Sequence, residues 1–340
     1  MSLGLGAASL RSHEIQLRNN NYAQAPDQTL LQSNGFTKVI VRVFSDDEKN
    51  GGLYFINPLF KAVRPVLDNW APEFLRGEVS FWAWMGGRYF SWMKDSPYLD
   101  REWRNGQKRV IPKLDLFNPE AEQLLVSLFR ALAQKPIRGI LIQDDLVLGR
   151  SEGFSNWGKA CFTMATGLPA EEHLMSLPNS AHSRAWERVK CGRLVQVLEK
   201  IVLACKAVNP QLKIAMNIHY ELPLAPTESR SWYAHDAPAL AASSLDYLYL
   251  MAYHRQIKSE LGLSETANRL YFVKMAAAAL ESFGPKLVLK LQVRDWQTSA
   301  LIPLAELKTY YDLIPAGIER VCFAAADPED IPILARIFGK

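Results

Sequence analysis

The sequence lacks several features that would each identify a class of protein. Only four cysteines occur among 340 residues, and none forms a CxxC pair, which argues against a zinc site or a redox motif. No uninterrupted apolar segment reaches the length of about 18 residues that spans a membrane, so we expect no membrane-spanning helix. The first residues also lack the basic start and the apolar core of a signal peptide.

An excess of charge of one sign is missing as well. The 39 lysines and arginines nearly balance the 35 aspartates and glutamates, which leaves a formal net charge of +4. No long run of like charges resembles an arm that binds DNA or RNA. The sequence therefore indicates no nucleic-acid partner.

The signatures of several enzyme classes are absent too. No glycine-rich phosphate loop follows an apolar run, no G-x-S-x-G nucleophile elbow occurs, and no HxH or HExxH spacing is found. His219, Glu221 and His254 could contribute to a set of metal ligands, but their spacing is a weak signal. We therefore expect neither a metal nor another cofactor.

What the chain does contain is a recurrence of short apolar runs, rich in β-branched and aromatic residues. They predict buried strands at 39–44, 79–85, 139–142, 213–218, 247–251, 286–292 and 320–324, and a possible opening strand at 4–10. Between them, apolar residues at three- and four-residue spacing predict helices at 121–133, 186–208 and 267–282. Eight strands with helical crossovers are typical of a (β/α)8 TIM-type barrel.

We expect residues 1–340 to form one such domain, because no linker, low-complexity stretch or short repeat interrupts the pattern. A doubly wound open sheet is the alternative, but the glycine-rich loop that often accompanies it is missing. Two connections, from Gly86 to about Pro119 and from Val147 to about Ala185, are long. Both leave the C-terminal face of the predicted barrel, so we expect them to form walls around a groove.

The most informative stretch is the apolar run 139–142, which leads through Gln143 into Asp144 and Asp145. Barrel enzymes carry their catalytic residues at the C-terminal ends of strands. A pair of aspartates after a strand can equally cap a turn or a helix by accepting bonds from backbone N–H groups. Neighbouring side chains on a strand point to opposite sides, so we expect one aspartate to face the substrate and the other to orient it or a nearby loop.

Polar and aromatic residues at the other predicted strand ends suit a carbohydrate, whose rings stack on aromatic faces and whose hydroxyls bond to acids and amides. The candidates for substrate binding are Asp46, Trp84, Asp115, Asn217, His219, Tyr253, Gln292 and Trp296. Of these, Trp84, Tyr253 and Trp296 are the expected stacking surfaces. Glycoside hydrolysis usually needs a second group besides the acid, and Glu221, Asp46 or Asp115 could supply it.

Two blocks, Trp82–Met85 and Gly139–Asp145, resemble the C-terminal glycoside hydrolase domain of the PgaB-type poly-β-1,6-N-acetyl-D-glucosamine deacetylases, which act in biofilm exopolysaccharide export. The resemblance extends from about Val39 to Asp327. It includes further ordered blocks at 43–46, 53–58, 217–218, 222–223, 251–253 and 291–292, with Trp296.

The resemblance implies a (β/α)8 barrel that cleaves partially deacetylated poly-β-1,6-N-acetyl-D-glucosamine. It gives Asp144 the leading catalytic position, as general acid, with Asp145 beside it. It also implies a periplasmic or otherwise exported protein, with the polysaccharide export machinery as a candidate partner. The deacetylase domain of the family has no counterpart in these residues, so we expect no deacetylation by this chain.

Three positions depart from the family pattern. Lys290 stands where the family has an acidic residue in the penultimate strand, Gln143 where it has histidine, and Glu221 where relatives are apolar. We therefore expect the catalytic carboxylates to be Asp144, Asp145 and Glu221. The alternatives are a non-catalytic polysaccharide-binding module that guides polymer for export, which Lys290 favours, and a glycosidase of different linkage specificity.

Overall fold

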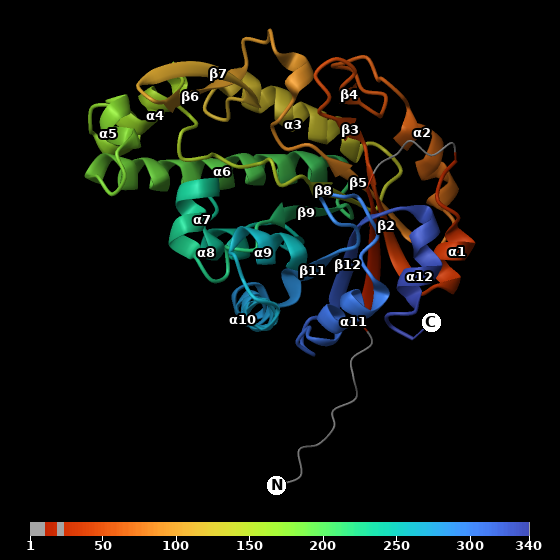
Figure 1. Ribbon diagram of the computed structural model, residues 1–340. Coiled ribbons are helices and arrows are strands. Elements are labelled where there is room, and N and C mark those ends of the chain that lie inside the picture. The colour runs from red at the N-terminus through yellow and green to blue at the C-terminus, as the bar shows by residue number, and fades with distance from the viewer. Residues whose placement is uncertain (1–10, 19–23, 340) are drawn as a thin grey trace.

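The structure is a computed structural model that describes residues 11–18 and 24–339. Eight parallel strands close into a barrel in the order β1, β2, β5, β8, β9, β10, β11 and β12 (Figure 1). They span Ser12–Leu17, Phe36–Arg42, Ser80–Met85, Gly139–Ile142, Lys213–Ile218, Tyr247–Ala252, Leu287–Gln292 and Arg320–Ala326, respectively. β1 pairs in parallel with both β2 and β12, which closes the barrel. The predicted (β/α)8 fold is confirmed.

Helices surround the barrel and connect its strands. Those of eight residues or more are α3 (Pro119–Ala133), α4 (Asn156–Thr166), α6 (Ala181–Val208), α7 (Pro226–Tyr233), α10 (Glu265–Phe283) and α11 (Leu304–Asp312). The shorter ones are α1 (Gln28–Ser33), α2 (Val66–Trp70), α5 (Glu172–Ser176), α8 (Ala237–Ala242), α9 (His254–Glu260) and α12 (Ile331–Ala335).

The three helices predicted from apolar spacing are all present, and each begins a few residues earlier than expected. The reason is side-chain capping: Asn118, Ser180 and Ser264 accept hydrogen bonds from backbone N–H groups at the starts of α3, α6 and α10. In the part of the chain described, no helix combines the length and the apolar character needed to cross a bilayer.

One strand prediction is not tested by the structure, and another needs correction. The possible opening strand at 4–10 lies outside the described residues, and the first barrel strand among those described is β1. The run 39–44 is not one strand, because β2 ends at Arg42 and the chain continues into a small antiparallel pair, β3 (Phe44–Ser45) with β4 (Gly52–Leu53). Val43 bonds at its N–H to the Trp84 carbonyl and at its carbonyl to the Tyr54 N–H, which redirects the chain.

The two long connections are more ordered than loops. The first contains a hairpin of β6 (Leu99–Arg104) and β7 (Gln107–Leu114), whose turn residues Asn105 and Gly106 have φ values of 52° and 73°. An Asn-Gly pair is the usual signal for such a turn. The second connection carries α4 and α5. Figure 1 shows the hairpin beside these two helices and above α6. An ion pair between Lys108 and Glu172 joins the hairpin to α5.

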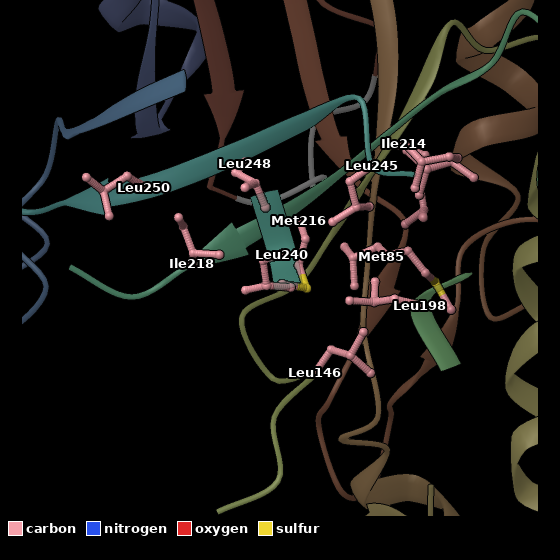
Figure 2. Packing of buried hydrophobic residues seen from close by; sticks show 14 of the residues in the cluster. Met85, Leu146, Leu198, Ile214, Met216, Ile218, Leu240, Leu245, Leu248 and Leu250 are labelled. Atoms are coloured by element: carbon pink, nitrogen blue, oxygen red, sulfur yellow. The ribbon is translucent and has the colours of Figure 1, made fainter. Parts of the chain in front are cut away.

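Two layers of apolar side chains pack on the strands. The outer layer lies between strands and helices; Figure 2 shows part of it, where Met216 and Ile218 of β9 and Leu248 and Leu250 of β10 pack near Leu240 of α8. The inner layer fills the barrel with Ile40, Trp82, Leu141, Ala215, Tyr249, Val288 and Cys322. Alternation along each strand produces the two layers, and because the strands are parallel, the residues that follow them lie at one mouth of the barrel.

Gly139 begins β8 against the inner layer, and we expect Gly139→Ala to destabilise the protein. A Cβ at this position would lie 2.4 Å from the Trp82 ring, which is itself only 2% exposed and has no room to move. The free energy of unfolding, measured by guanidinium denaturation, should fall by about 1–3 kcal/mol.

Gly192→Ala in the middle of α6 is the matched control. A Cβ there meets no atom within 4 Å, so the better helix propensity of alanine should raise stability by up to about 1 kcal/mol. Equal effects of the two substitutions would contradict the packing argument.

Candidate active site

Several predicted residues meet where the strands end at one mouth of the barrel. Asp144 follows β8 and is partly exposed. Burial, and next the negative charge of Asp144, raise the pKa of Tyr253, which follows β10. The pKa of Tyr233, at the end of α7, is raised as well. Burial is the largest cause, followed by the charge of Glu221 and, more weakly, that of Asp144. Asp144 therefore lies within electrostatic range of two tyrosines, one at the end of α7 and one after β10.

Lys290 of β11 points into the barrel beneath this mouth. Its Nζ donates a 2.7 Å hydrogen bond to Asn217 Oδ1 of β9, and it lies 5.9 Å from the Trp84 ring centroid and 6.0 Å from that of Tyr253. Burial lowers the pKa of Lys290 to about 8, although the charge of Asp144 partly opposes this. Lys290 of β11 therefore lies among side chains of β5 and β9 and the residue after β10, and Asp144 is near enough to affect its pKa.

Trp84 is held in place from several sides. Its indole N–H donates to Gln143 Oε1 of the loop that carries Asp144, and Phe44 packs edge-on against its ring at 5.9 Å. The Arg42 guanidinium lies 5.3 Å from the Trp84 ring centroid and pairs at 2.7 Å with Asp46. Asp46 thus engages Arg42 at the rim, and the half-buried Trp84 offers a ring fixed in orientation.

Asp145 points away from Asp144, as expected for neighbours. Its carboxylate accepts hydrogen bonds from the backbone N–H groups of Gly87, Arg88 and Tyr89, at 2.6, 2.9 and 2.6 Å. Burial raises the pKa of Asp145, and these three donors oppose that rise. A Cβ at Gly87 would lie 2.7 Å from Asp145 Oδ1, so this tight fit needs glycine. The geometry gives Asp145 a positioning function in place of the direct catalytic part expected for it.

Glu221 lies in the loop after β9 and accepts a hydrogen bond from Tyr233, the ring whose pKa Asp144 also raises. The carboxylate is 9% exposed; Oε1 accepts a 3.0 Å bond from the Tyr233 hydroxyl, and Oε2 has no partner within the described part of the chain. His219 stacks on Tyr233 with ring centroids 3.8 Å apart and planes at 9°. A second carboxylate therefore stands on the side of the mouth where Tyr233 lies.

Buried polar atoms without a hydrogen-bond partner gather near this mouth. Such atoms are rare in folded proteins unless water or a ligand satisfies them. Among the described residues at these strand ends they are Gln16 Oε1, Asn217 Nδ2, His219 Nε2, Glu221 Oε2 and Gln292 Oε1. They can bond to the hydroxyl and amide groups of a carbohydrate.

Two predicted residues do not join this group. Asp115 is 2% exposed, accepts a 2.9 Å bond from the Phe117 N–H, and has a pKa raised by burial. It belongs to the protein interior, which corrects its prediction as a substrate ligand or second carboxylate. Trp296 is 57% exposed on the loop after β11, where its ring is open to solvent.

Sequence reasoning missed the buried cation that holds the loops of this face. Arg88 is fully buried and bonds to Asp100 at 2.6 Å, to Glu152 at 2.8 Å and to the Leu114 carbonyl at 2.9 Å. Burial alone would raise the pKa of Glu152, but Arg88 and Lys113 lower it to about 2. The Gly86-Gly87 pair before Arg88 was the available signal of a tight turn.

In residues 11–18 and 24–339, no three metal-binding side chains converge.

His235 supports the same loop, and its protonation should couple stability to pH. Its Nε2 donates to the Leu146 carbonyl at 3.3 Å, and burial, followed by the nearby His219, lowers the pKa of His235 from 6.5 to about 3. The unfolded chain takes up a proton that the folded protein excludes. The contribution of the neutral, buried His235 to the free energy of unfolding is therefore fully present above pH 6.5. It is lost as the pH falls from 6.5 toward 3.

We expect His235→Gln to reduce the pH dependence of the free energy of unfolding between about pH 4 and pH 6 by up to about 1.4 kcal/mol per pH unit. Urea denaturation over that range measures the slope independently of any uniform loss of stability. His173→Gln, at an exposed histidine, is the control and should leave the slope unchanged. An unaltered slope in His235→Gln would contradict neutral burial of His235.

Comparison with known proteins identifies the family of this barrel. No curated protein sequence matches the chain. Among solved structures, the PgaB (BpsB) glycoside hydrolase domain from Bordetella bronchiseptica is similar with a TM-score of 0.76 at 20% identity, over 96% of this chain and 98% of that one. This similarity confirms the resemblance expected from the sequence blocks.

Two β-galactosidases share the fold over part of their length. The enzyme from the psychrophilic Marinomonas ef1 has a TM-score of 0.69 at 12% identity, over 96% of this chain and 59% of that one. The cold-adapted enzyme from Rahnella sp. R3 has a TM-score of 0.62 at 14% identity, over 97% and 56%. Residues 21–323 match the family model described as hypothetical glycosyl hydrolase family 13. The chain belongs to this family and is a glycoside hydrolase.

Proposed function

We propose that the chain hydrolyses a hexosamine exopolysaccharide, namely partially deacetylated poly-β-1,6-N-acetyl-D-glucosamine, with Asp144 as the general acid. The observation that carries the proposal is the position of Asp144: a partly exposed carboxylate at the end of β8, within electrostatic range of Tyr253, Tyr233 and Lys290. The resemblance to the PgaB-type domain supplies the substrate. It also suggests an exported protein that works beside the export machinery.

Each group at the mouth has a part in this reaction. Sugar rings stack on Trp84 and Tyr253, with the exposed Trp296 farther out, and the unpartnered atoms of Asn217 and Gln292 bond to hydroxyls. Asp144 protonates the glycosidic oxygen as the bond to the anomeric carbon breaks.

Glu221 is the proposed second carboxylate. Tyr233 fixes its Oε1, and the partnerless Oε2 remains to act on water or on the anomeric carbon. His219, stacked on Tyr233, helps to hold that ring, and Asp145 holds the loop after β5.

Asp144→Asn should abolish most of the hydrolysis. The amide keeps the size of the side chain but cannot donate a proton of useful acidity, so kcat should fall by about 10²–10⁴ in an assay of reducing ends released from the partially deacetylated polymer. Asp312→Asn on α11 changes an exposed carboxylate that pairs with Lys308, and it should leave turnover unchanged. Unchanged turnover in Asp144→Asn would remove Asp144 from the mechanism.

Glu221→Gln should lower kcat by about 10² or more, because the second carboxylate is lost. Tyr233→Phe removes only the hydrogen bond that holds Glu221 and should cost less, on the order of tenfold. Thermal unfolding of both variants separates catalysis from stability. If neither variant changes kcat while both fold, Glu221 has no catalytic part.

The same assay tests the other two readings of the sequence. Binding of the polymer without release of reducing ends by the unaltered protein would favour a module that guides polymer, an idea that the buried cation Lys290 supports. Cleavage of other polysaccharides in a small panel, without cleavage of the β-1,6-linked polymer, would favour a glycosidase of different linkage specificity.

A further inference from the structure

The barrel contains two buried lysines, and their partners differ. Lys38 Nζ lies 2.7 Å from Glu14 Oε1, 2.9 Å from the Tyr249 hydroxyl and 3.9 Å from the Trp82 ring centroid. Its charge is neutralised by direct contact. At the mouth, Lys290 is 1% exposed, and its hydrogen bond goes to Asn217, a neutral amide.

No carboxylate in the described part of the chain forms an ion pair with Lys290. Asp144 acts on it from a distance, as the opposed shift of its pKa indicates. Glu221 exerts its charge mainly on Tyr220, Tyr233 and Tyr271. A buried ammonium without a contacting anion costs stability. Its placement below the mouth therefore points to a function there.

The charge lies close to both stacking surfaces. Lys290 Nζ lies 5.9 Å from the ring centroid of Trp84 and 6.0 Å from that of Tyr253. A sugar that stacks on either ring would therefore lie only a few ångströms farther from this charge than the ring itself. The side chain is covered, so such a sugar would feel its charge across a layer of low polarity, where solvent screens weakly.

We propose that Lys290 is a specificity-determining residue that selects an N-acetylated hexosamine, and rejects a protonated free hexosamine, at the sugar position next to Trp84 and Tyr253. This inference rests on the proposed function and makes it more specific. The ammonium repels a second ammonium, whereas the acetamido group is neutral and its carbonyl oxygen faces a positive potential favourably. In a partially deacetylated polymer, the chain would therefore bind and cleave at acetylated units.

The test compares two β-1,6-linked oligosaccharides of equal length, one fully N-acetylated and one fully deacetylated, at about pH 6, where the glucosamine amine is protonated. The unaltered protein should favour the acetylated compound in kcat/KM by about tenfold or more, as expected for two charges some 8 Å apart in a partly screened site. Lys290→Met keeps the length of the side chain without its charge and should bring that ratio close to one.

Two controls separate the field of Lys290 from other causes. Lys258→Met removes the same charge from the surface of α9 and should leave the ratio unchanged. Lys290→Arg keeps the charge and should keep the preference. Participation of the acetamido group in catalysis would also favour the acetylated compound, but it would persist in Lys290→Met, so an unchanged ratio in that variant overturns the proposal.

Binding distinguishes failure of this inference from failure of the proposed function. Calorimetric titration of the unaltered full chain and of Lys290→Met with both oligosaccharides needs no turnover. Tighter binding of the acetylated compound that depends on Lys290, without cleavage, would retain the specificity and reject the proposed hydrolysis. Equal binding of both compounds by the unaltered protein, or a preference for the deacetylated one, would overturn the inference. If Lys290→Met fails to fold, the unaltered protein and Lys290→Arg still give that comparison.

Discussion

The functional face of this barrel depends on one buried guanidinium. Arg88 bonds to Asp100 in the β6–β7 hairpin, to Glu152 and the Val147 carbonyl in the loop after β8, and to the Leu114 carbonyl at the end of β7. A planar group with five N–H donors can satisfy several acceptors at once, which a lysine could not do in the same geometry. Removal of Arg88 would leave its acceptors buried and unpaired. The positions of the loops around the proposed site therefore depend on one another through this side chain.

The aspartate pair connects this scaffold to the chemistry. Asp145 accepts three backbone N–H bonds from the segment that contains Arg88, and its neighbour Asp144 is thereby directed to the mouth. Adjacent residues divide the work because their side chains leave the chain on opposite sides. The cap interpretation therefore holds for Asp145, and the site interpretation stays a prediction for Asp144. Tyr233 donates a hydrogen bond to Glu221, and its pKa is raised by burial, by Glu221 and more weakly by Asp144, so both carboxylates lie near this ring.

Charge inside the barrel shows the same division between scaffold and site. In the barrel interior, Lys38 and Glu14 satisfy each other, and the pair is a structural element. At the mouth, Lys290 donates to Asn217, a neutral amide. Asn217 Nδ2 and Gln292 Oε1 have no hydrogen-bond partner among the described residues. Such unpaired groups lower stability in return for a preorganised environment, which is the arrangement expected where a ligand must be bound and a bond broken.

The sequence by itself determined the barrel, and it predicted which end carries the site. Short apolar runs predicted β5 and β8 to β12 to within a residue or two, because the composition of a buried strand is a local property. It also placed Asp144 at a strand end. Only the tertiary structure decided that Asp115 is internal, that Asp145 faces the backbone, and which side chains Arg88, Tyr233 and Lys290 contact. Those roles depend on contacts between residues far apart in the chain, and neither spacing nor composition encodes which side chain meets which.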